Sequence, residues 1–188
     1  MHPELAKIDE IYRSIEDVVL LDSIEYLKSL SQEELTNYSK ARNAASKILT
    51  DTVNRSFTII QNLTSAEIVE AYPKAGVILK KNLGGYMYFY FHETFIPTMI
   101  NGIKNGDSSA YLFLGRLSEH LPRPDLISLL RTALYLKERR LRDTALGLVE
   151  QLKITELISE VQQLEANTDI NISEQAKRVR VVLENEKS

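Results

Sequence analysis

Leu126-Ile127-Ser128 recurs along the chain as Leu157-Ile158-Ser159, 31 positions later. Three further pairs keep the same separation: Ala145 with Ala176, Leu148 with Val179, and Leu152 with Leu183. A fixed period of roughly 20 to 50 residues is typical of stacked helical repeats. One such unit cannot bury its apolar face alone, so a neighbouring unit must cover it. The period therefore predicts helix pairs packed against one another in this part of the chain.

The same pattern extends toward the N-terminus with a shorter loop. The first apolar stripe of this earlier unit is Phe95, Ile96, Met99 and Ile103, and it aligns with Leu126, Ile127, Leu130 and Leu134. The second stripe, Ala110, Phe113 and Leu117, aligns only when the loop is four residues shorter. Pro122 and Pro124 lack an amide hydrogen and must end the preceding helix. We therefore expect three helix–turn–helix units, over about 92–121, 124–153 and 155–186.

The N-terminal half carries helix-start signals of a different kind. Ser31 with Glu34, and Thr64 with Glu67, have the spacing of capping boxes, and Pro73 should interrupt the helix that follows the second box. Leu83-Gly84-Gly85 is the clearest break near the middle of the chain. We therefore expect an N-terminal helical region over 1–85, either divergent repeats or a helical cap, and a repeat region over 86–188, within one continuous domain.

Two segments resemble the second helix of a HEAT repeat. They are Leu141-Arg142-x-x-Ala145-x-x-Leu148-Val149-x-x-Leu152 and Ile172-Ser173-x-x-Ala176-x-x-Val179-x-x-x-Leu183, with Ser173 in place of the usual arginine. From about residue 92 onward the chain thus resembles the HEAT-like and armadillo-type α-helical repeat superfamily. The resemblance implies an all-α fold of antiparallel helix pairs in a curved superhelix of about three repeats. It also implies that Arg142 braces neighbouring repeats by pairing with an acidic group, for which Asp143 and Glu138 are near.

Composition excludes several classes of function. The 188 residues carry a net charge of −3 and include no cysteine, which excludes disulfides, thiol nucleophiles and cysteine-based metal sites. The acidic balance argues against a duplex nucleic-acid binder, which needs a basic face. The N-terminus shows no signal-peptide pattern, and the most apolar run, 86–91, is far too short for a bilayer helix. We therefore expect a cytoplasmic protein without a membrane partner.

No motif of the chain predicts catalysis. His92-Glu93-Thr94-Phe95-Ile96 begins like a zinc-protease motif, but Ile96 stands where the second histidine must be. Gly84-Gly85 is not followed by the Lys-Ser/Thr of a phosphate-binding loop. We therefore predict no catalytic residue, no cofactor and no metal site, and a protein that is not an enzyme.

Two surface candidates remain for partner binding. The first is an aromatic patch of Tyr86, Tyr88 and Tyr90, in a run that we expect to be helical because no second strand-like run exists to pair with it. The patch is either core between the two halves or an exposed anchor for a partner, because tyrosine is enriched at binding hot spots.

The second candidate is a basic cluster in the turn of the middle unit: Lys137, Arg139, Arg140 and Arg142. A solvated turn, an acidic protein partner and nucleic acid are the three interpretations of this cluster. Taken together, the sequence favours a non-catalytic protein-interaction module, a helical-repeat scaffold or adaptor. An antitoxin or immunity-type inhibitor that binds one partner, and a HEAT-like nucleic-acid-binding protein, are the alternatives. The identity of the partner and the oligomeric state stay open.

Overall fold

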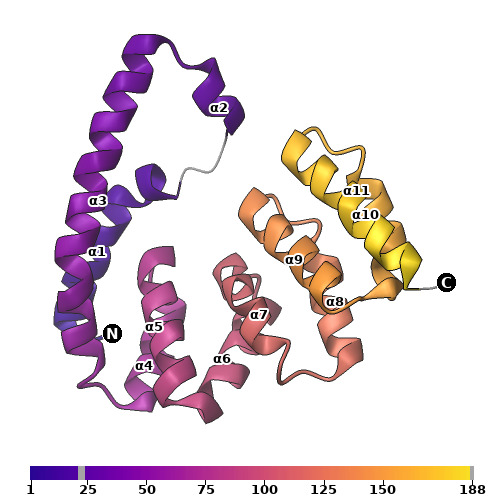
Figure 1. The fold of residues 1–188 in the computed structure, drawn as a ribbon. Helices are drawn as coiled ribbons and strands as arrows, with labels where there is room; N and C mark the ends of the chain where they lie inside the picture. Colours follow the sequence, from indigo (N-terminus) through magenta and orange to yellow (C-terminus); the bar gives the residue numbers. More distant parts are fainter. Residues whose placement is uncertain (21–23, 187–188) are drawn as a thin grey trace. The chain divides into compact units, whose positions relative to one another are not determined.

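The computed structural model describes residues 1–20 and 24–186, and their regular secondary structure is entirely helical (Figure 1). The all-α prediction is therefore confirmed. The helices form two compact units, Met1–Ser109 and Ala110–Ser188. Within the described ranges, no helix is both long and apolar enough to span a bilayer.

The division falls later in the chain than we expected from the sequence. We placed a boundary at Leu83-Gly84-Gly85, but α5 (Val77–Tyr90) continues through both glycines without a break. An interior glycine costs a helix about 1 kcal/mol relative to alanine. Here α5 packs against four other α-helices of its unit, and Leu83 and Gly84 are buried, so tertiary packing offsets that cost.

Within the described residues, seven helical segments lie entirely in unit 1. They are α1 (Pro3–Val19), α2 (Ile24–Ser29), α3 (Gln32–Ile60), α4 (Ser65–Ala71), the 3-10 turn η1 (Tyr72–Lys74), α5 and α6 (His92–Lys104). Both capping boxes form as predicted, at Ser31 with Glu34 and at Thr64 with Glu67. Pro73 interrupts the chain between α4 and α5, also as predicted. Figure 1 shows α1 alongside the C-terminal half of the long helix α3.

A buried polar cluster joins three helices in the core of unit 1. The hydroxyl of Tyr12 in α1 donates to Ser56 Oγ in α3 at 3.2 Å. The amide nitrogen of Asn82 in α5 donates to both oxygens, at 3.3 Å each. Tyr12 and Ser56 are fully buried, so these bonds satisfy groups that would otherwise lie unpaired in the core. The cluster therefore fixes how α1, α3 and α5 pack together.

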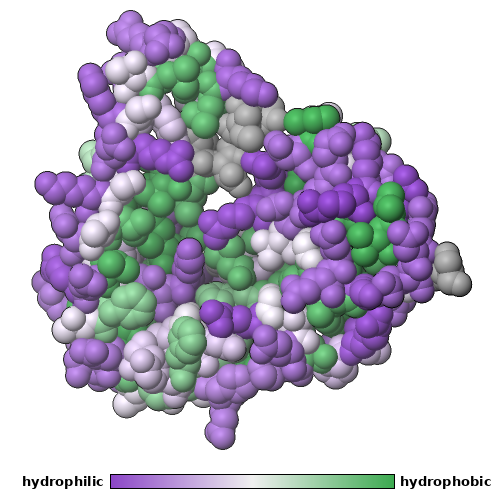
Figure 2. Space-filling model, in the orientation of Figure 1, coloured by the Kyte–Doolittle hydropathy of each residue, from purple (hydrophilic) through white to green (hydrophobic). Residues whose placement is uncertain are grey.

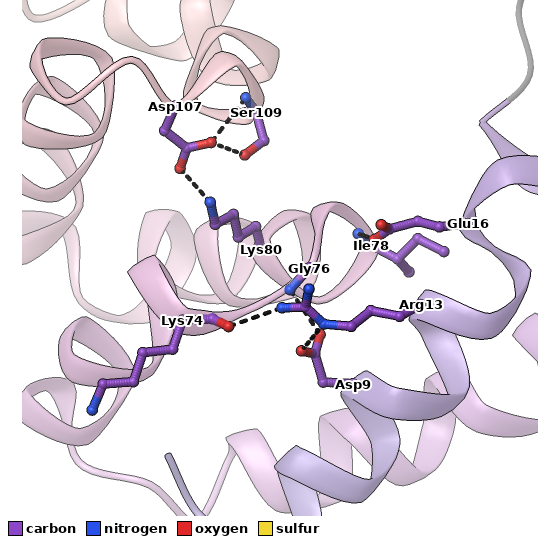
Figure 3. Close-up of polar contacts among 9 residues, drawn as sticks. All are labelled: Asp9, Arg13, Glu16, Lys74, Gly76, Ile78, Lys80, Asp107 and Ser109. Atoms are coloured by element: carbon purple, nitrogen blue, oxygen red, sulfur yellow. Dashed lines mark hydrogen bonds and ion pairs between the residues drawn. The ribbon is translucent and has the colours of Figure 1, made fainter.

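The N-terminus of α5 is capped by another helix. Its N-cap residue is Gly76, which has no side chain to accept the orphan amides of the first turn. Figure 3 shows two carboxylates of α1 in that role. Asp9 Oδ1 accepts from the Gly76 amide at 2.8 Å, and Glu16 Oε1 accepts from the Ile78 amide at 3.2 Å. Both negative charges also lie at the positive end of the helix dipole.

Arg13 completes this junction from the same face of α1. Its Nε donates to Asp9 Oδ2 at 2.8 Å, and its Nη2 donates to the carbonyl of Lys74 at 3.0 Å (Figure 3). Asp9 is only 3% exposed, so its charge needs these partners. One turn of α1 thus holds both the end of η1 and the start of α5.

This packing makes a prediction that separates two glycines of the same region. A Cβ at Gly76 would lie 2.8 Å from Glu16 Oε1 and 3.2 Å from Asp9 Oδ1, whereas a Cβ at Gly85 would meet nothing within 4 Å. Gly76→Ala should lower the free energy of unfolding by about 1–3 kcal/mol, because it overpacks the junction. Gly85→Ala should raise it by about 0.5–1 kcal/mol, because alanine favours a helix interior. Urea unfolding of both variants measures the difference, and equal effects would contradict the capping role.

Unit 2 contains helices in the region where the period predicted the second and third helix pairs. After η2 (Ser108–Phe113), which begins in unit 1, come α7 (Leu114–Leu117), α8 (Arg123–Ala133), α9 (Arg139–Gln151), η3 (Thr155–Leu157), α10 (Ile158–Leu164) and α11 (Ile170–Asn185). Helix α8 packs on α9, α10 on α11, and α9 on α11. The first expected pair is instead divided, since α6 belongs to unit 1 and α7 to unit 2.

Ion pairs connect each helix pair of unit 2 to the next. Arg123 pairs with Glu156 at 2.9 Å and Arg131 with Glu160 at 2.6 Å. Between the second helices of the two pairs, Arg178 of α11 pairs with Glu150 of α9 at 3.0 Å. Exposed pairs of this kind contribute about 0–1 kcal/mol each. The two residues of each ion pair are separated in the sequence by close to the 31-residue period. Figure 2 shows that the visible face of this unit is mostly hydrophilic.

Candidate functional site

The aromatic patch lies at the end of α5 and at the corner between α5 and α6. The rings of Tyr86 and Tyr90 lie 4.5 Å apart between centroids, and Phe91 lies 5.8 Å from Tyr86. Tyr90 is 67% exposed and Phe89 is 68% exposed. The patch is therefore largely a surface feature, and the interpretation of it as core holds only for part of the run.

Tyr88 belongs to the inner side of the same patch. Its ring is half-buried and contacts Phe95 of α6, which is fully buried, edge-on at 5.3 Å. It also lies 5.1 Å from Phe89 and 5.9 Å from His92. Tyr88 thus packs the corner against the core, while most of the surface of Tyr90 and Phe89 is exposed to solvent. The sequence predicted the patch but not this division, because six consecutive apolar residues have no polar face to orient them.

The basic cluster separates into two kinds of residue. Arg142 Nη1 donates to the carbonyls of Leu136 at 2.7 Å and Lys137 at 2.9 Å. These carbonyls follow the end of α8, where the helix leaves acceptors without intrahelical partners. The HEAT resemblance implied that Arg142 would pair with an acidic group in the turn. The hydrogen bonds of its Nη1 are instead to backbone oxygens within its own helix pair.

Arg139 has a structural contact with the next helix pair. Its Nε lies 3.0 Å from Asp169 Oδ2 at the start of α11, and the side chains are 25% and 11% exposed. The contact is an ion pair, since the Nε–H group is not aligned for a hydrogen bond. Lys137 and Arg140 are exposed. The cluster therefore presents two exposed cations beside two arginines that serve the fold.

The roles of these arginines differ enough to be separated by mutation. Arg142→Ala should lower the free energy of unfolding by about 1.5–3 kcal/mol, because it leaves carbonyls of the α8–α9 turn without a charged donor. Arg140→Ala should change it by less than about 0.5 kcal/mol, as exposed positions do. Thermal unfolding followed by circular dichroism checks both. A neutral Arg142→Ala variant would show that the turn does not depend on this side chain.

Unit 1 also contains an open cavity that the sequence did not reveal. Its volume is about 700 Å³, within the range of small-ligand pockets, and it lies between the α4–η1 segment and α6. Lys80 and Asp107 both line it, and Lys80 Nζ pairs with Asp107 Oδ2 at 2.8 Å (Figure 3). Asp107 Oδ1 accepts from the amide of Ser109 at 3.1 Å, so the carboxylate is held from two sides. Lys80 and Asp107 are 27 positions apart, and no motif links them.

Tyr72 of η1 forms part of the cavity wall beside this ion pair. The residue is 2% exposed, and Lys80 Nζ lies 5.7 Å from the centre of its ring. Burial raises the pKa of Tyr72, the Asp107 carboxylate raises it further, and the Ser109 hydroxyl offsets part of the rise. The tyrosine therefore stays protonated far into the alkaline range.

This shift predicts a late component in the alkaline titration of the protein. Tyr72 should ionise well above the ordinary tyrosine value of 10.0, and Tyr72→Phe should remove that component from the ultraviolet absorbance of tyrosinate. Because the pKa is raised on folding, the stability that Tyr72 contributes is complete below pH 10. It is lost as the pH rises through the folded-state value. A titration curve that is the same in Tyr72→Phe, apart from one ordinary tyrosine, would refute the shift.

The described residues contain no group of three or more histidine and acidic side chains placed to hold a metal ion. Comparisons with protein family models, with curated proteins and with solved structures found no match to the chain. The geometry of the structure itself gives three candidate sites: the aromatic patch, the exposed pair Lys137 and Arg140, and the cavity of unit 1.

Proposed function

We propose that this chain is a non-catalytic protein-interaction module, a scaffold or adaptor built from HEAT-like helical repeats. The observation that carries the proposal is the aromatic patch. Exposed tyrosine and phenylalanine side chains on a rigid helix corner are typical hot spots, because they bury much area at little entropic cost. Tyr90 and Phe89 meet that description, with two thirds of each residue exposed.

The helix pairs of unit 2 support the repeat part of the proposal. Two consecutive pairs, α8–α9 and α10–α11, are joined by α9–α11 packing and by the Arg131–Glu160 and Glu150–Arg178 ion pairs. Repeat arrays act by presenting extended surfaces, so binding is the function such an array favours. Fold alone does not define the function, and the patch is what points to a partner.

The basic cluster gives less support to the nucleic-acid alternative. Counterion release requires several cations aligned along a face. In the cluster, Arg139 and Arg142 are engaged by Asp169 and by backbone carbonyls, which leaves Lys137 and Arg140 as the exposed cations of the turn. The inhibitor alternative would use the same aromatic surface, but with one tight partner instead of several.

The proposal is tested by capture of partners with a tagged protein, followed by measurement of the affinity for the protein recovered. The double variant Phe89→Ser/Tyr90→Ser should weaken that affinity by about thirtyfold or more, since a lost hot spot costs about 2 kcal/mol or more. Val181→Ser is the matched control, because Val181 is an exposed apolar residue of α11, 50% exposed. It should bind normally.

A second double variant, Lys137→Glu/Arg140→Glu, separates the two candidate surfaces. Loss of binding in this variant alone would place the binding surface at the α8–α9 turn. Full binding in both double variants would contradict both surfaces. Circular dichroism of each variant establishes that the helices are retained before affinities are compared.

A further inference from the structure

The α6 wall of the unit 1 cavity carries a proline one turn after an acidic residue. Pro97 lies inside α6 and lines the cavity together with Glu93, four residues earlier. Proline has no amide hydrogen, so the carbonyl of Glu93 loses the donor that a helix normally supplies. The same residue adds a carboxylate to the cavity lining.

The charges that line the cavity have a negative sum. They are Lys80, Glu93 and Asp107. Lys80 is neutralised by Asp107 at 2.8 Å, and these two side chains are only 14% and 16% exposed. Glu93 is exposed, and across the part of the chain that the structure describes no ion pair to it is seen. A cation would complete both the charge and the hydrogen bonds of this wall.

The opposite wall, from α4 and η1, includes apolar surface. Val69 and Pro73 line it, and Val69 is 36% exposed. A ligand that suits both walls has an alkyl stem ending in a planar cationic donor. Arginine has this shape, and its guanidinium fork donates to a carboxylate and to a further acceptor at once. A compact ammonium ion satisfies fewer of these acceptors at fixed positions.

We propose that this cavity is a docking groove for an arginine side chain of an extended segment of a partner protein. The guanidinium pairs with the Glu93 carboxylate and donates to the Glu93 carbonyl, while the alkyl stem lies against Val69 and Pro73. The volume of about 700 Å³ exceeds one side chain, so the groove also holds the residues that flank the arginine. The site does not include the aromatic patch, and it rests on the proposed function only in that its occupant is a protein segment.

A direct titration tests the groove without any knowledge of the natural partner. The probe is the capped peptide acetyl-Ala-Ala-Arg-Ala-Ala-amide, added to ¹⁵N-labelled full-length protein. Its matched control replaces arginine by citrulline, which has the same shape and no charge. The arginine peptide should shift the amide signals of Thr94, Thr98, Asn101 and Gly102, and the citrulline peptide should bind at least about tenfold more weakly.

Two variants give opposite expected effects. Glu93→Gln should weaken the affinity for the arginine peptide by roughly fivefold, because it removes an exposed ion pair. Lys80→Met should strengthen it severalfold, because it releases the Asp107 carboxylate from its internal partner. Glu33→Gln, an exposed glutamate in the first turn of α3, should have no effect.

The outcomes separate this proposal from the aromatic patch. Equal binding of the two peptides, absence of shifts in α6, or an unchanged affinity in Glu93→Gln would each overturn the arginine site. Binding of free agmatine as tightly as the peptide would also overturn it, by identifying a small-molecule site. Phe89→Ser/Tyr90→Ser should bind the arginine peptide normally, so failure of the patch and failure of the groove are distinguishable.

Discussion

Unit 1 depends on one buried carboxylate. Asp9 is 3% exposed and accepts from the amide of Gly76 and from Arg13, and through them the first helix fixes where α5 begins. A buried charge of this kind is stable only when its partners are complete. The constraint therefore works in both directions: α5 needs Asp9 as its cap, and Asp9 needs α5 to be tolerated in the core.

Both candidate surfaces of unit 1 lie after that junction in the sequence. The aromatic patch forms at the other end of α5, and Lys80 of the cavity lies one turn after Gly76.

Unit 2 reaches its order by another route. Ion pairs between its helices join residues whose separation in the sequence is close to the period of the apolar pattern. Arg131 and Glu160 are 29 positions apart, and Arg123 and Glu156 are 33 apart, close to the 31 of the apolar repeat. Individually these exposed pairs add little stability. Their contribution is to the register between neighbouring helix pairs, because all of these ion pairs form together in the observed one.

The sequence predicted most where the signal is local or periodic. The capping boxes at Ser31 and Thr64, the interruption at Pro73, the helical state of 86–90 and the helices after Pro122 all follow from short-range chemistry. The continuation of α5 through Gly84 and Gly85 did not, because tertiary packing overrides weak propensity. The cap on Gly76 was equally hidden, since its acceptors Asp9 and Glu16 lie 67 and 62 positions away.

The candidate sites divide along the same line. A run of tyrosines is visible in the sequence, but its exposed half is defined only once Tyr88 is seen against Phe95. The basic cluster is visible too, yet the structure commits Arg142 to carbonyls of its own turn and Arg139 to Asp169. The ion pair at the cavity has no signature in the sequence, because Lys80 meets Asp107 only when α5 and the end of α6 are in place. A proline inside a helix leaves a carbonyl without its donor, and Pro97 can be read from the sequence. Only the structure shows that Pro97 and Glu93 line the same cavity.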